Sequence, residues 1–425
     1  MLDIRLIRTD PGTVREGLAR RGIATGGDSV DRILELDETR REAIGEANDL
    51  KAKRNEVSRV IGELKRAGED ASEMVAQMRE VGARISVLDQ GVADSEEEIQ
   101  RLLLDIPNVP LPEVPAGGEE ANVVVRRWGD PPTFEFDPVP HWDLGEALGI
   151  LDLPAGAKIS GSGFPVLRGS GARLQRNLID FMLDLHTTEH GYEEVRLPYL
   201  VNRESLTGTG QLPKFEDDLY MLDRDDLGLI PTAEVPITNL YRDELLSGDQ
   251  VPARITGYSP CFRREAGAAG KDTRGLLRVH QFDKVELVRY ETPERSREAL
   301  DELTAEAETV LQRLGLPYRV LLLAAGDLGF SSAMTYDLEV WAPGVERWLE
   351  VSSCSVFTDY QARRAGIRFR QSQAEKPRFV HTLNGSGVAL PRLIVALLET
   401  YQQADGSVRF PEAIRPFVGM SEILP

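Results

Sequence analysis

The sequence is poor in the residues from which several kinds of site are built. Only two cysteines, Cys261 and Cys354, occur in 425 residues, which excludes a disulfide framework and a four-cysteine zinc site. The five histidines show no metal-ligand spacing, and we interpret the two that lie four residues apart, His186 and His190, as a surface pair on a helix. The remaining three are His141, His280 and His381.

Long apolar runs and a phosphate loop are also lacking. No apolar stretch has the length of a membrane span or of a signal peptide, so we expect a soluble, cytoplasmic protein with no membrane partner. The stretch GAAGKDT, Gly267 to Thr273, has some features of a phosphate loop. Its glycine spacing fails, however, and Asp272 follows the lysine where Ser or Thr is needed.

Positive charge is scarce as well. Lysine and arginine number 50 against 70 aspartate and glutamate residues, for a formal net charge of −20. This balance argues against a general, charge-driven coat for nucleic acid but leaves room for a local basic face. The length favours two or three domains, and a hydrophobic content of 41% is enough for a globular core.

Residues 30–104 carry a seven-residue hydrophobic repeat in two halves. Gly68 between the halves predicts a helix stop, and Asp70 the N-cap of the next helix. Two helices of about 35 residues joined by so short a turn must run antiparallel and form a rod roughly 50 Å long. The repeat is carried in the first half by Leu36, Ala43, Leu50, Val57 and Leu64, and in the second by Ala71, Met78, Ile85, Val92 and Ile99.

The distal half of this hairpin is basic although the hairpin as a whole is acidic. Between residues 51 and 66, six cations face only Glu56 and Glu63. A basic surface of this kind suits a phosphate backbone. From the pattern alone, a dimerisation or spacer element with a solvated charged face remains an alternative. The six cations are Lys51, Lys53, Arg54, Arg59, Lys65 and Arg66.

A proline-rich stretch separates this region from the rest of the chain. We assign residues 1–110 to an N-terminal domain, 111–140 to a linker and 141–425 to a second domain. Beyond the linker, short alternating strands are interspersed with helices, which predicts an α+β domain built on an antiparallel sheet with helices on one side. We expect helices near 171–189, 293–314 and 388–403, and strands near 219–231, 253–264, 282–290, 317–323, 334–342 and 347–356.

The segment Tyr258–Tyr290 carries the strongest signal for chemistry. Arg263 and Glu265 lie two apart in a segment with strand character, so we expect their side chains on one face of the sheet. After a basic loop, Phe282 and Glu286 share a face of the next strand. Arginine suits phosphate, an aromatic ring suits a base and carboxylates suit amino groups, so this hairpin predicts a nucleotide-binding surface.

Three further segments fit the same chemistry. Thr232 and Glu234 come at a strand end where a loop begins, although a helix N-cap is an alternative for this pair. In RWLEVSSCS, Glu350, Ser352 and Ser353 are hard oxygen donors suited to Mg²⁺ bridging phosphates. Small residues in NGSG precede a helix with Arg392 on its first turn, a position suited to a triphosphate.

These motifs together resemble the class II aminoacyl-tRNA synthetases, and in particular the bacterial seryl-tRNA synthetase family. The resemblance spans nearly the whole chain. It is carried by FRREAG at 262–267 and the run from 275 to 287, and by IPN at 106–108, HWDLGE at 141–146, PTAE at 231–234, EVSSCS at 350–355, TDYQARR at 358–364 and NGSG at 384–387.

The resemblance implies a homodimer, with Pro198 near the contact, that joins L-serine to tRNA(Ser), and also to tRNA(Sec), using ATP and Mg²⁺. The hairpin would be the tRNA-binding arm, and Arg263, Glu265 and Arg392 would be catalytic. Glu350 and Ser353 would lie near the magnesium ion. The residues implied for serine are Thr232, Glu234, Arg263, Glu286, Asn384 and Ser386. Those implied for ATP are Arg263, Glu265, Val279, Phe282, Glu350, Val351, Ser352, Ser353 and Arg392.

Two positions depart from the family pattern, Met334 where lysine is common and Val356 where asparagine is common. Both flank the strands expected at the site, so an altered pocket in a pathway-specific paralogue is an alternative. A second alternative is an amino acid:carrier-protein ligase, and a third is a non-catalytic binding protein. The long hairpin argues against the second, and the intact set Arg263, Glu286 and Arg392 argues against the third.

Overall fold

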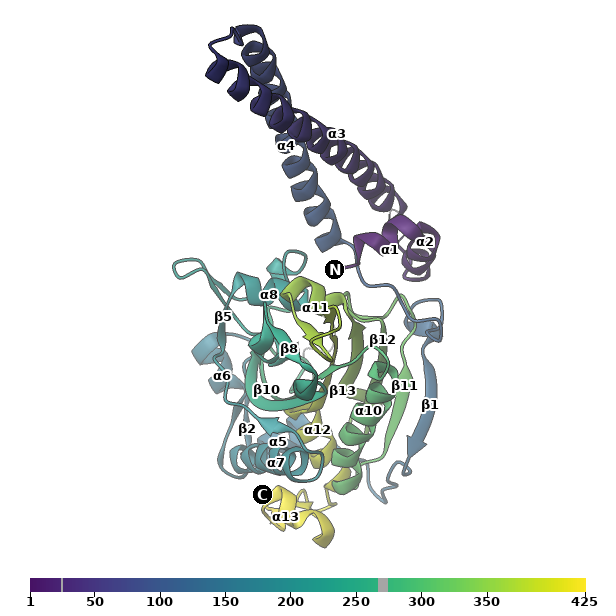
Figure 1. The fold of residues 1–425 in the computed structure, drawn as a ribbon. Coiled ribbons are helices and arrows are strands. Elements are labelled where there is room, and N and C mark those ends of the chain that lie inside the picture. The colour runs from purple at the N-terminus through teal and green to yellow at the C-terminus, as the bar shows by residue number, and fades with distance from the viewer. Residues whose placement is uncertain (24–25, 267–273) are drawn as a thin grey trace. The chain divides into compact units, whose positions relative to one another are not determined.

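The computed structural model describes residues 1–23, 26–266 and 274–425 (Figure 1). The motif GAAGKDT at 267–273 lies outside the described residues. The chain divides into two units, the first made of residue 1, residues 20–22 and residues 108–425, and the second of residues 2–19 and 23–107. No helix in the described ranges is long and apolar enough to cross a membrane.

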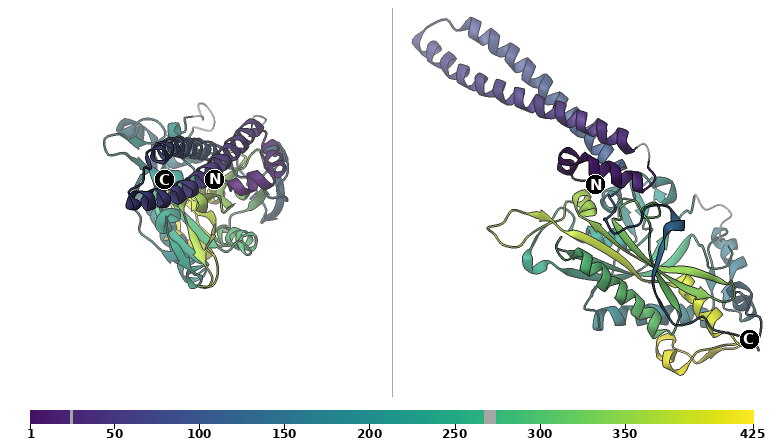
Figure 2. Two further views of the ribbon diagram at one scale, coloured as in Figure 1. Left: turned by 45° about the horizontal axis from the view of Figure 1, so that its top comes forward. Right: turned by 90° about the vertical axis from the view of Figure 1, so that its right-hand side faces the viewer.

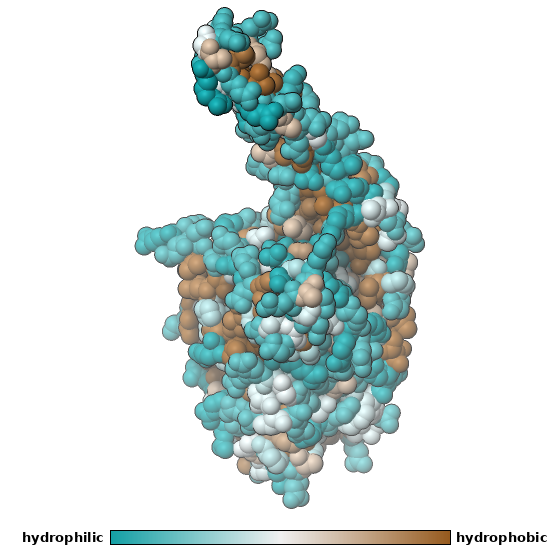
Figure 3. All heavy atoms as spheres, viewed as in Figure 1, coloured by the Kyte–Doolittle hydropathy of each residue, from teal (hydrophilic) through white to brown (hydrophobic). Residues whose placement is uncertain are grey.

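The second unit is a helical arm. Its elements are α1 (Ile4–Thr9), α2 (Pro11–Arg20), α3 (Gly26–Ala67) and α4 (Ser72–Asp105). Helices α3 and α4 run antiparallel and side by side (Figure 2), which confirms the predicted hairpin. On the face seen in Figure 3, hydrophilic residues cover most of the arm.

The seam of the arm follows the heptad repeat. Ile33, Ile85 and Ile99 are buried between the helices, as an apolar stripe of this period requires. Ser95 interrupts the repeat, and its buried hydroxyl donates to the Gly91 carbonyl oxygen at 2.8 Å within its own helix. The helix therefore tolerates this polar residue at a seam position without an unpaired group.

The turn at the tip differs by one residue from the prediction. Gly68 has a φ of +80°, the left-handed conformation in which glycine ends a helix. The N-cap position of α4 is Ala71 and not Asp70. Asp70 still accepts the backbone N–H of Ser72 at 2.9 Å, so its carboxylate satisfies one free donor of the helix end.

The first unit is built on an eight-stranded sheet in the order β1-β11-β12-β13-β16-β10-β9-β4. All neighbours are antiparallel except β4 and β9. The strands are β1 (Val123–Trp128), β4 (Glu193–Glu194), β9 (Ala253–Phe262), β10 (Gln281–Glu291), β11 (Tyr318–Leu322), β12 (Met334–Ala342), β13 (Arg347–Thr358) and β16 (His381–Ala389).

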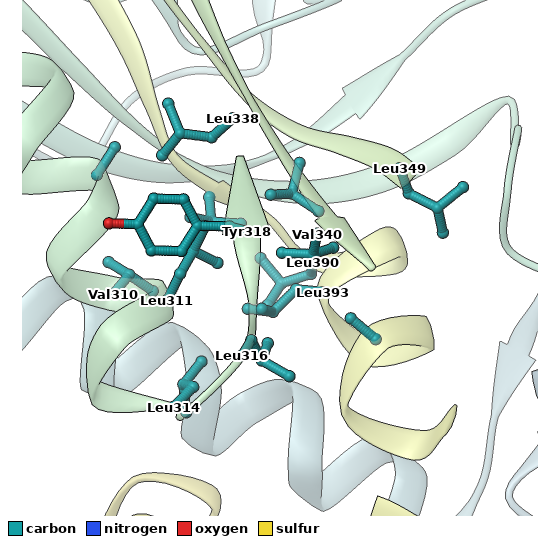
Figure 4. Packing of buried hydrophobic residues seen from close by; sticks show 14 of the residues in the cluster. Val310, Leu311, Leu314, Leu316, Tyr318, Leu338, Val340, Leu349, Leu390 and Leu393 are labelled. Atoms are coloured by element: carbon teal, nitrogen blue, oxygen red, sulfur yellow. The ribbon is translucent and has the colours of Figure 1, made fainter. Parts of the chain in front are cut away.

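Three helices pack on the sheet, namely α7 (Gly169–Thr188), α10 (Ser296–Arg313) and α12 (Leu390–Tyr401). Their buried residues recur at helical spacing, for example Leu300, Leu303 and Val310 on α10. Figure 4 shows Val310 of α10 and Leu393 of α12 meeting side chains of β11, β12 and β13. This layer fixes the sheet and leaves its other face for a site.

Shorter elements surround this core. They are α5 (His141–Ala147), β2 (Leu151–Asp152), α6 (Leu153–Ser160), β3 (Val166–Leu167), β5 (Leu200–Asn202), α8 (Arg203–Thr209), β6 (Met221–Leu222), β7 (Leu227–Leu229), α9 (Glu234–Thr238), β8 (Leu245–Ser247), α11 (Tyr360–Ala365), β14 (Arg368–Arg370), β15 (Arg378–Phe379), β17 (Val408–Arg409), α13 (Arg415–Val418) and β18 (Glu422–Ile423). The stretch 111–140, expected as a linker, contributes the edge strand β1 to the sheet.

The NGSG motif lies within strand β16, which leads directly into α12, so its small residues precede the helix that carries Arg392, as predicted. Its glycines face the helices, where space is short. A Cβ on Gly385 would lie 3.0 Å from the Cys354 sulfur, and one on Gly387 2.8 Å from Nε2 of His186. His186 is therefore fully buried under the sheet, and its interpretation as half of a surface pair was wrong.

The two departures from the family pattern form one contact. Met334 on β12 is the cross-strand partner of Val356 on β13, and both are buried in the hydrophobic core that the helices cover. They lie on the face of the sheet that carries Cys354 and not on the face that carries Ser353 and Ser355. An apolar pair thus occupies both positions together, away from the candidate site described below.

This pairing yields a stability prediction. Met334→Lys places an ammonium in an apolar layer without a partner, and we expect it to lower the free energy of unfolding by about 3 kcal/mol or more. Adding Val356→Asn supplies a cross-strand hydrogen-bond acceptor and should restore part of that loss. Urea unfolding of the two single variants and the double variant measures the coupling. Strict additivity of the two losses would contradict the paired interpretation.

Candidate active site

A cavity of about 460 Å³ opens on the face of the sheet that α10 does not cover. It brings together residues that the sequence placed in five separate motifs. Of the residues predicted for serine and ATP, those that line it are Thr232, Glu234, Arg263, Glu265, Val279, Phe282, Glu350, Val351, Ser353, Asn384, Ser386 and Arg392.

The alternation of strand side chains explains which residues reach the cavity. On β13, Ser353 and Ser355 line it, whereas Ser352 and Cys354 face the helices. The Ser352 hydroxyl donates to the Ser386 carbonyl oxygen at 2.7 Å and is 1% exposed. The prediction placed Ser352 with ATP. In the structure its side chain supports strand β16 and does not reach the cavity.

A fully buried carboxylate, Glu286, lies beneath the cavity floor. Thr232 Oγ1 donates to Glu286 Oε2 at 2.9 Å, and Asn384 Nδ2 donates to Oε1 at 3.1 Å. The Lys284 ammonium forms an ion pair with the same carboxylate and donates to Thr232 Oγ1 at 3.1 Å. Both oxygens of the Glu286 carboxylate are thus held by a partner, as a buried charge requires, and the carboxylate keeps acceptor capacity for one further donor.

The prediction missed Lys284 as a site residue. It stands two positions before Glu286 on β10, so strand alternation places both side chains on one face. Lysine is rarely buried without an ionic partner, and Lys284 is only 6% exposed. The spacing of the two residues in HQFDKVE was therefore a usable signal.

Glu234 is a second buried carboxylate beside this cluster. Burial, and then the negative charge of Glu286, raises the pKa of Glu234 to about 7. Gln361 donates to Glu234 Oε1 at 2.6 Å, and Thr232 Oγ1 accepts the backbone N–H of Glu234 at 3.1 Å. The N-cap position of α9 is Ala233, so Thr232 is not the N-cap residue, and its side chain lines the cavity.

Arg263 lies just past the end of β9 and not within a strand, which corrects the reason given for its position. Its backbone N–H extends the ladder by donating to the His280 carbonyl oxygen at 2.9 Å. Its guanidinium donates to the Pro231 carbonyl oxygen at 3.2 Å and lies 5.0 Å from the Phe282 ring centroid. Glu265 follows with a φ of +51° and pairs with Arg278.

Arg392 on the first turn of α12 is held in place by carbonyl oxygens. It donates to the Glu350 carbonyl oxygen at 2.8 Å and to that of Leu277 at 3.0 Å, and its guanidinium lies 3.5 Å from the Glu350 carboxylate. A guanidinium anchored in this way presents a fixed positive charge to the cavity.

Asp337 is a further acidic residue that the prediction missed. It faces Ser353 across the β12–β13 pair, and its Oδ1 is buried without a hydrogen-bond partner in the described part of the chain. Burial, and then the charge of Glu350, raises the pKa of Asp337 well above the usual carboxylate range. Oxygen donors with one unsatisfied acceptor fit a hard divalent cation.

No group of three or more His, Cys, Asp and Glu side chains within residues 1–23, 26–266 and 274–425 is arranged to hold a metal ion by itself. A cation near Glu350 and Ser353 would therefore need oxygen ligands from another molecule. Mg²⁺ is commonly held in this way, by one or two carboxylates together with substrate phosphates.

The predicted tRNA-binding cations all lie on α3. From the heptad repeat, Lys51, Arg59, Lys65 and Arg66 fall on one side of the helix and Lys53 on the other side of the seam, whereas Arg54 lies at a seam position, seven residues after the buried Ala47. Lys51 forms an ion pair with Asp89 of α4 at 2.8 Å. Its charge is therefore partly compensated within the arm.

Comparison with known proteins decides the family. Residues 1–110 match the seryl-tRNA synthetase N-terminal domain, and residues 214–401 match the tRNA synthetase class II core domain (G, H, P, S and T). The chain is 60% identical over 420 residues to the serine–tRNA ligase of Gemmatimonas aurantiaca, covering 99% of both chains. It is 56% identical over 427 residues to that of Geobacillus kaustophilus, covering both completely.

The chain belongs to the seryl-tRNA synthetase family. It is thus a class II serine–tRNA ligase, as the motifs indicated. Seryl-tRNA synthetase from Pyrococcus horikoshii, solved in complex with ATP, superposes with a TM-score of 0.96 at 41% identity over the full length of both chains. The cytoplasmic enzyme of Naegleria fowleri, solved with AMP, gives 0.89 at 32% identity. Relatives that match over their whole length do not favour the paralogue or carrier-protein alternatives.

Lys284 yields a prediction for this seryl-tRNA synthetase site. Lys284→Met keeps a long, unbranched side chain but removes the cation that pairs with Glu286. The buried carboxylate is then left partly unpaired. We expect the serine kcat/KM in ATP–pyrophosphate exchange to fall by about tenfold or more. Lys158→Met, at an exposed position, is the matched control. Unchanged exchange by Lys284→Met would remove this lysine from the site.

Proposed function

We propose that the cavity binds L-serine and ATP together and forms seryl-adenylate, which then acylates tRNA(Ser). The observation that carries the proposal is the Glu286 cluster, because it offers a small ligand several buried polar partners. A buried polar group that is left without a hydrogen-bond partner costs free energy. A ligand that lacks the hydroxyl therefore binds such a site more weakly than serine does. Serine satisfies these groups and alanine does not.

Each polar group of serine has a fitting partner. The ammonium fits the carboxylates of Glu234 and Glu286, and the hydroxyl fits Glu286 with Ser386 and Asn384 nearby. The carboxylate of serine fits Arg263, which also faces the phosphate to be attacked. The serine set is therefore Thr232, Glu234, Arg263, Glu286, Asn384 and Ser386.

ATP fits the adjoining part of the cavity. Phe282 offers a ring to the base, with Glu265 and Val279 beside it, and Arg392 offers charge to the phosphate tail. Glu350 and Ser353 would hold Mg²⁺ on the phosphates, where it neutralises charge on the reacting oxygens. The segment from Glu350 through Val351 lines this end.

Activation then follows from position and charge. A serine carboxylate oxygen attacks the α-phosphorus in line, the bond to the β-phosphate bridging oxygen breaks and pyrophosphate leaves. Arg263 stabilises the charge that develops on the α-phosphate oxygens, and Arg392 that on the leaving group. We assign no general base, because the attacking carboxylate is already ionised.

The arm and the assembly complete the proposal. The basic group of α3 fits the phosphate backbone of tRNA(Ser), and we extend the substrates to tRNA(Sec). We further propose a homodimer with Pro198 near the contact, acting in the cytoplasm. A domain of residues 1–110, with the arm at about 30–104, would then bind the tRNA, and residues 141–425 would perform the chemistry.

Serine-dependent ATP–pyrophosphate exchange tests the proposal. The unmodified protein should exchange with serine and far more slowly with alanine, glycine or threonine. Addition of tRNA(Ser) should then give seryl-tRNA. Exchange with another amino acid in preference to serine, or none at all, would refute the assignment.

The raised pKa of Glu234 predicts the pH dependence of serine capture. The ammonium of serine needs the ionised carboxylate, so kcat/KM for serine should fall as the pH drops below about 7, approaching tenfold per pH unit. Serine itself does not titrate between pH 5.5 and 8, so the change does not come from the amino acid. A Glu234→Gln variant should have a low kcat/KM for serine that does not change with pH over this range. A profile for that variant with the same inflection would assign the titration to another group.

The basic group of the arm yields a separate prediction. Arg54→Ala with Arg59→Ala should weaken tRNA(Ser) binding and lower the salt slope by roughly one log unit per lost phosphate contact. Serine-dependent exchange should stay unchanged. The control is Arg32→Ala with Arg84→Ala, which removes the same charge from cations paired with Glu98 and Glu46. If both pairs of substitutions weaken tRNA(Ser) binding equally, the effect comes from the net charge of the arm and not from Arg54 and Arg59 themselves.

A further inference from the structure

His141 and Glu399 are fully buried side chains to which the proposed function gives no role. His141 begins α5 in the motif HWDLGE, and Glu399 lies near the end of α12. Oε1 of Glu399 accepts the backbone N–H of His141 at 2.9 Å and lies 2.8 Å from the ring Nδ1 of the same residue. Oε2 accepts the backbone N–H groups of Gly344 at 2.8 Å and Val345 at 3.2 Å. The carboxylate is therefore firmly held within the core.

The other ring nitrogen of His141 contacts the chain just before β10. The backbone N–H of Leu276 donates to His141 Nε2 at 3.0 Å. Because Nε2 accepts this hydrogen bond, the ring carries its hydrogen on Nδ1 and donates it to Glu399. The imidazole thus joins a carboxylate of α12 to a backbone amide at residue 276.

Gly275 allows the ring to come this close. It has a φ of +66°, and a Cβ there would lie 2.2 Å from His141 Nε2. The residue before it is held by the same motif, since the Arg274 guanidinium lies 4.4 Å from the Trp142 ring centroid and 3.5 Å from the Asp143 carboxylate. The motif HWDLGE therefore contacts three consecutive residues, 274–276.

The next residue, Leu277, holds Arg392. Its carbonyl oxygen accepts Nε of Arg392 at 3.0 Å. Arg392 and Glu399 lie seven residues apart on α12, so both fall on one face of the helix, about two turns apart. One helix thus fixes two adjacent residues, Leu276 through His141 and Leu277 through Arg392.

This arrangement bears on the nucleotide end of the cavity. Leu276 and Leu277 line the cavity together with Arg392. With Nε held by Leu277 and one terminal nitrogen held by the Glu350 carbonyl oxygen, the guanidinium has a fixed orientation. A displaced Leu277 carbonyl would release Nε and let the guanidinium turn. The hydrogen bonds to Glu286, at the centre of the serine set, come from other segments of the chain.

We propose that His141 is a positioning residue for ATP. Held by Glu399, its ring fixes Leu276 and thereby the Leu277 carbonyl oxygen that orients Arg392. This inference rests on the proposed function, which assigns the phosphate tail of ATP to Arg392. Loss of the Nε2 acceptor should therefore weaken ATP binding and leave serine binding nearly unchanged.

Two amide substitutions separate the roles of the two ring nitrogens. The amide of asparagine falls near the position of Nδ1 and that of glutamine near Nε2, so His141→Asn keeps a donor for Glu399 and His141→Gln keeps an acceptor for Leu276. We expect His141→Asn to raise the KM for ATP in pyrophosphate exchange by about tenfold, with the KM for serine within about twofold. His141→Gln should keep the KM for ATP within about threefold.

Urea unfolding of the same two variants distinguishes positioning from a merely structural role. His141→Asn keeps the buried carboxylate of Glu399 paired and should be the more stable variant. His141→Gln should be less stable and yet bind ATP better. If ATP binding instead follows stability, His141 only supports the fold.

Gly275→Ala disturbs the same contact from the other side and leaves His141 and Glu399 in place. The added methyl group crowds Nε2, so this variant should raise the KM for ATP as His141→Asn does. Gly149→Ala is the matched control. Gly149 has a φ of +64°, and no atom lies within 4 Å of its Cβ position, so alanine there imposes the same backbone strain without the crowding.

Calorimetric titration with ATP alone tests binding independently of serine. His141→Asn and Gly275→Ala should bind ATP about tenfold more weakly than the unmodified protein and Gly149→Ala. Unchanged ATP binding by His141→Asn would overturn the inference, and so would KM values for ATP and serine that rise together. If the unmodified protein binds ATP but shows no serine-dependent exchange, the proposed function fails, and the titrations still decide the role of His141.

Discussion

The buried carboxylate of Glu286 is the constraint on which the site depends. A charge removed from water must be paired and hydrogen-bonded, or it destabilises the fold by several kcal/mol. Here Lys284, Thr232 and Asn384 supply those contacts from three different segments of the chain. The cost of leaving Glu286 unpaired therefore fixes the relative positions of strands β10 and β16 and of the loop before α9. The same contacts preorganise a polar pocket for a small polar ligand.

Side chains alternate between the two faces of a strand, and this alternation separates the residues that line the cavity from those that pack against the helices. Along β16, Asn384 and Ser386 face the cavity, whereas Gly385 and Gly387 let the helices come close behind it. On β13, adjacent serines point to opposite faces of the sheet. Ser353 lines the cavity, whereas the Ser352 hydroxyl donates a hydrogen bond to the backbone of β16. Packing and recognition thus share one strand through alternate residues.

Structural features that are encoded by a regular spacing of residues were predictable from the sequence. The heptad repeat predicted the arm, since two apolar stripes joined by a short turn have one way to bury themselves. Contacts between distant segments were not predictable in the same way. Strand alternation could have indicated Lys284, but the unsatisfied Asp337 and the hydrogen bond from Gln361 to Glu234 depend on which strands and loops become neighbours. The paired change at Met334 and Val356 became clear only through the register of β12 and β13.

The most direct test of this account is a crystal structure of the protein with a non-hydrolysable analogue of seryl-adenylate. The account predicts the seryl ammonium and hydroxyl on Glu234, Glu286 and Thr232, with the Lys284–Glu286 pair intact and the preformed cluster unmoved. Serine bound elsewhere in the cavity would contradict the account. So would a structure in which Glu286 leaves Lys284 and rebuilds the pocket around the ligand.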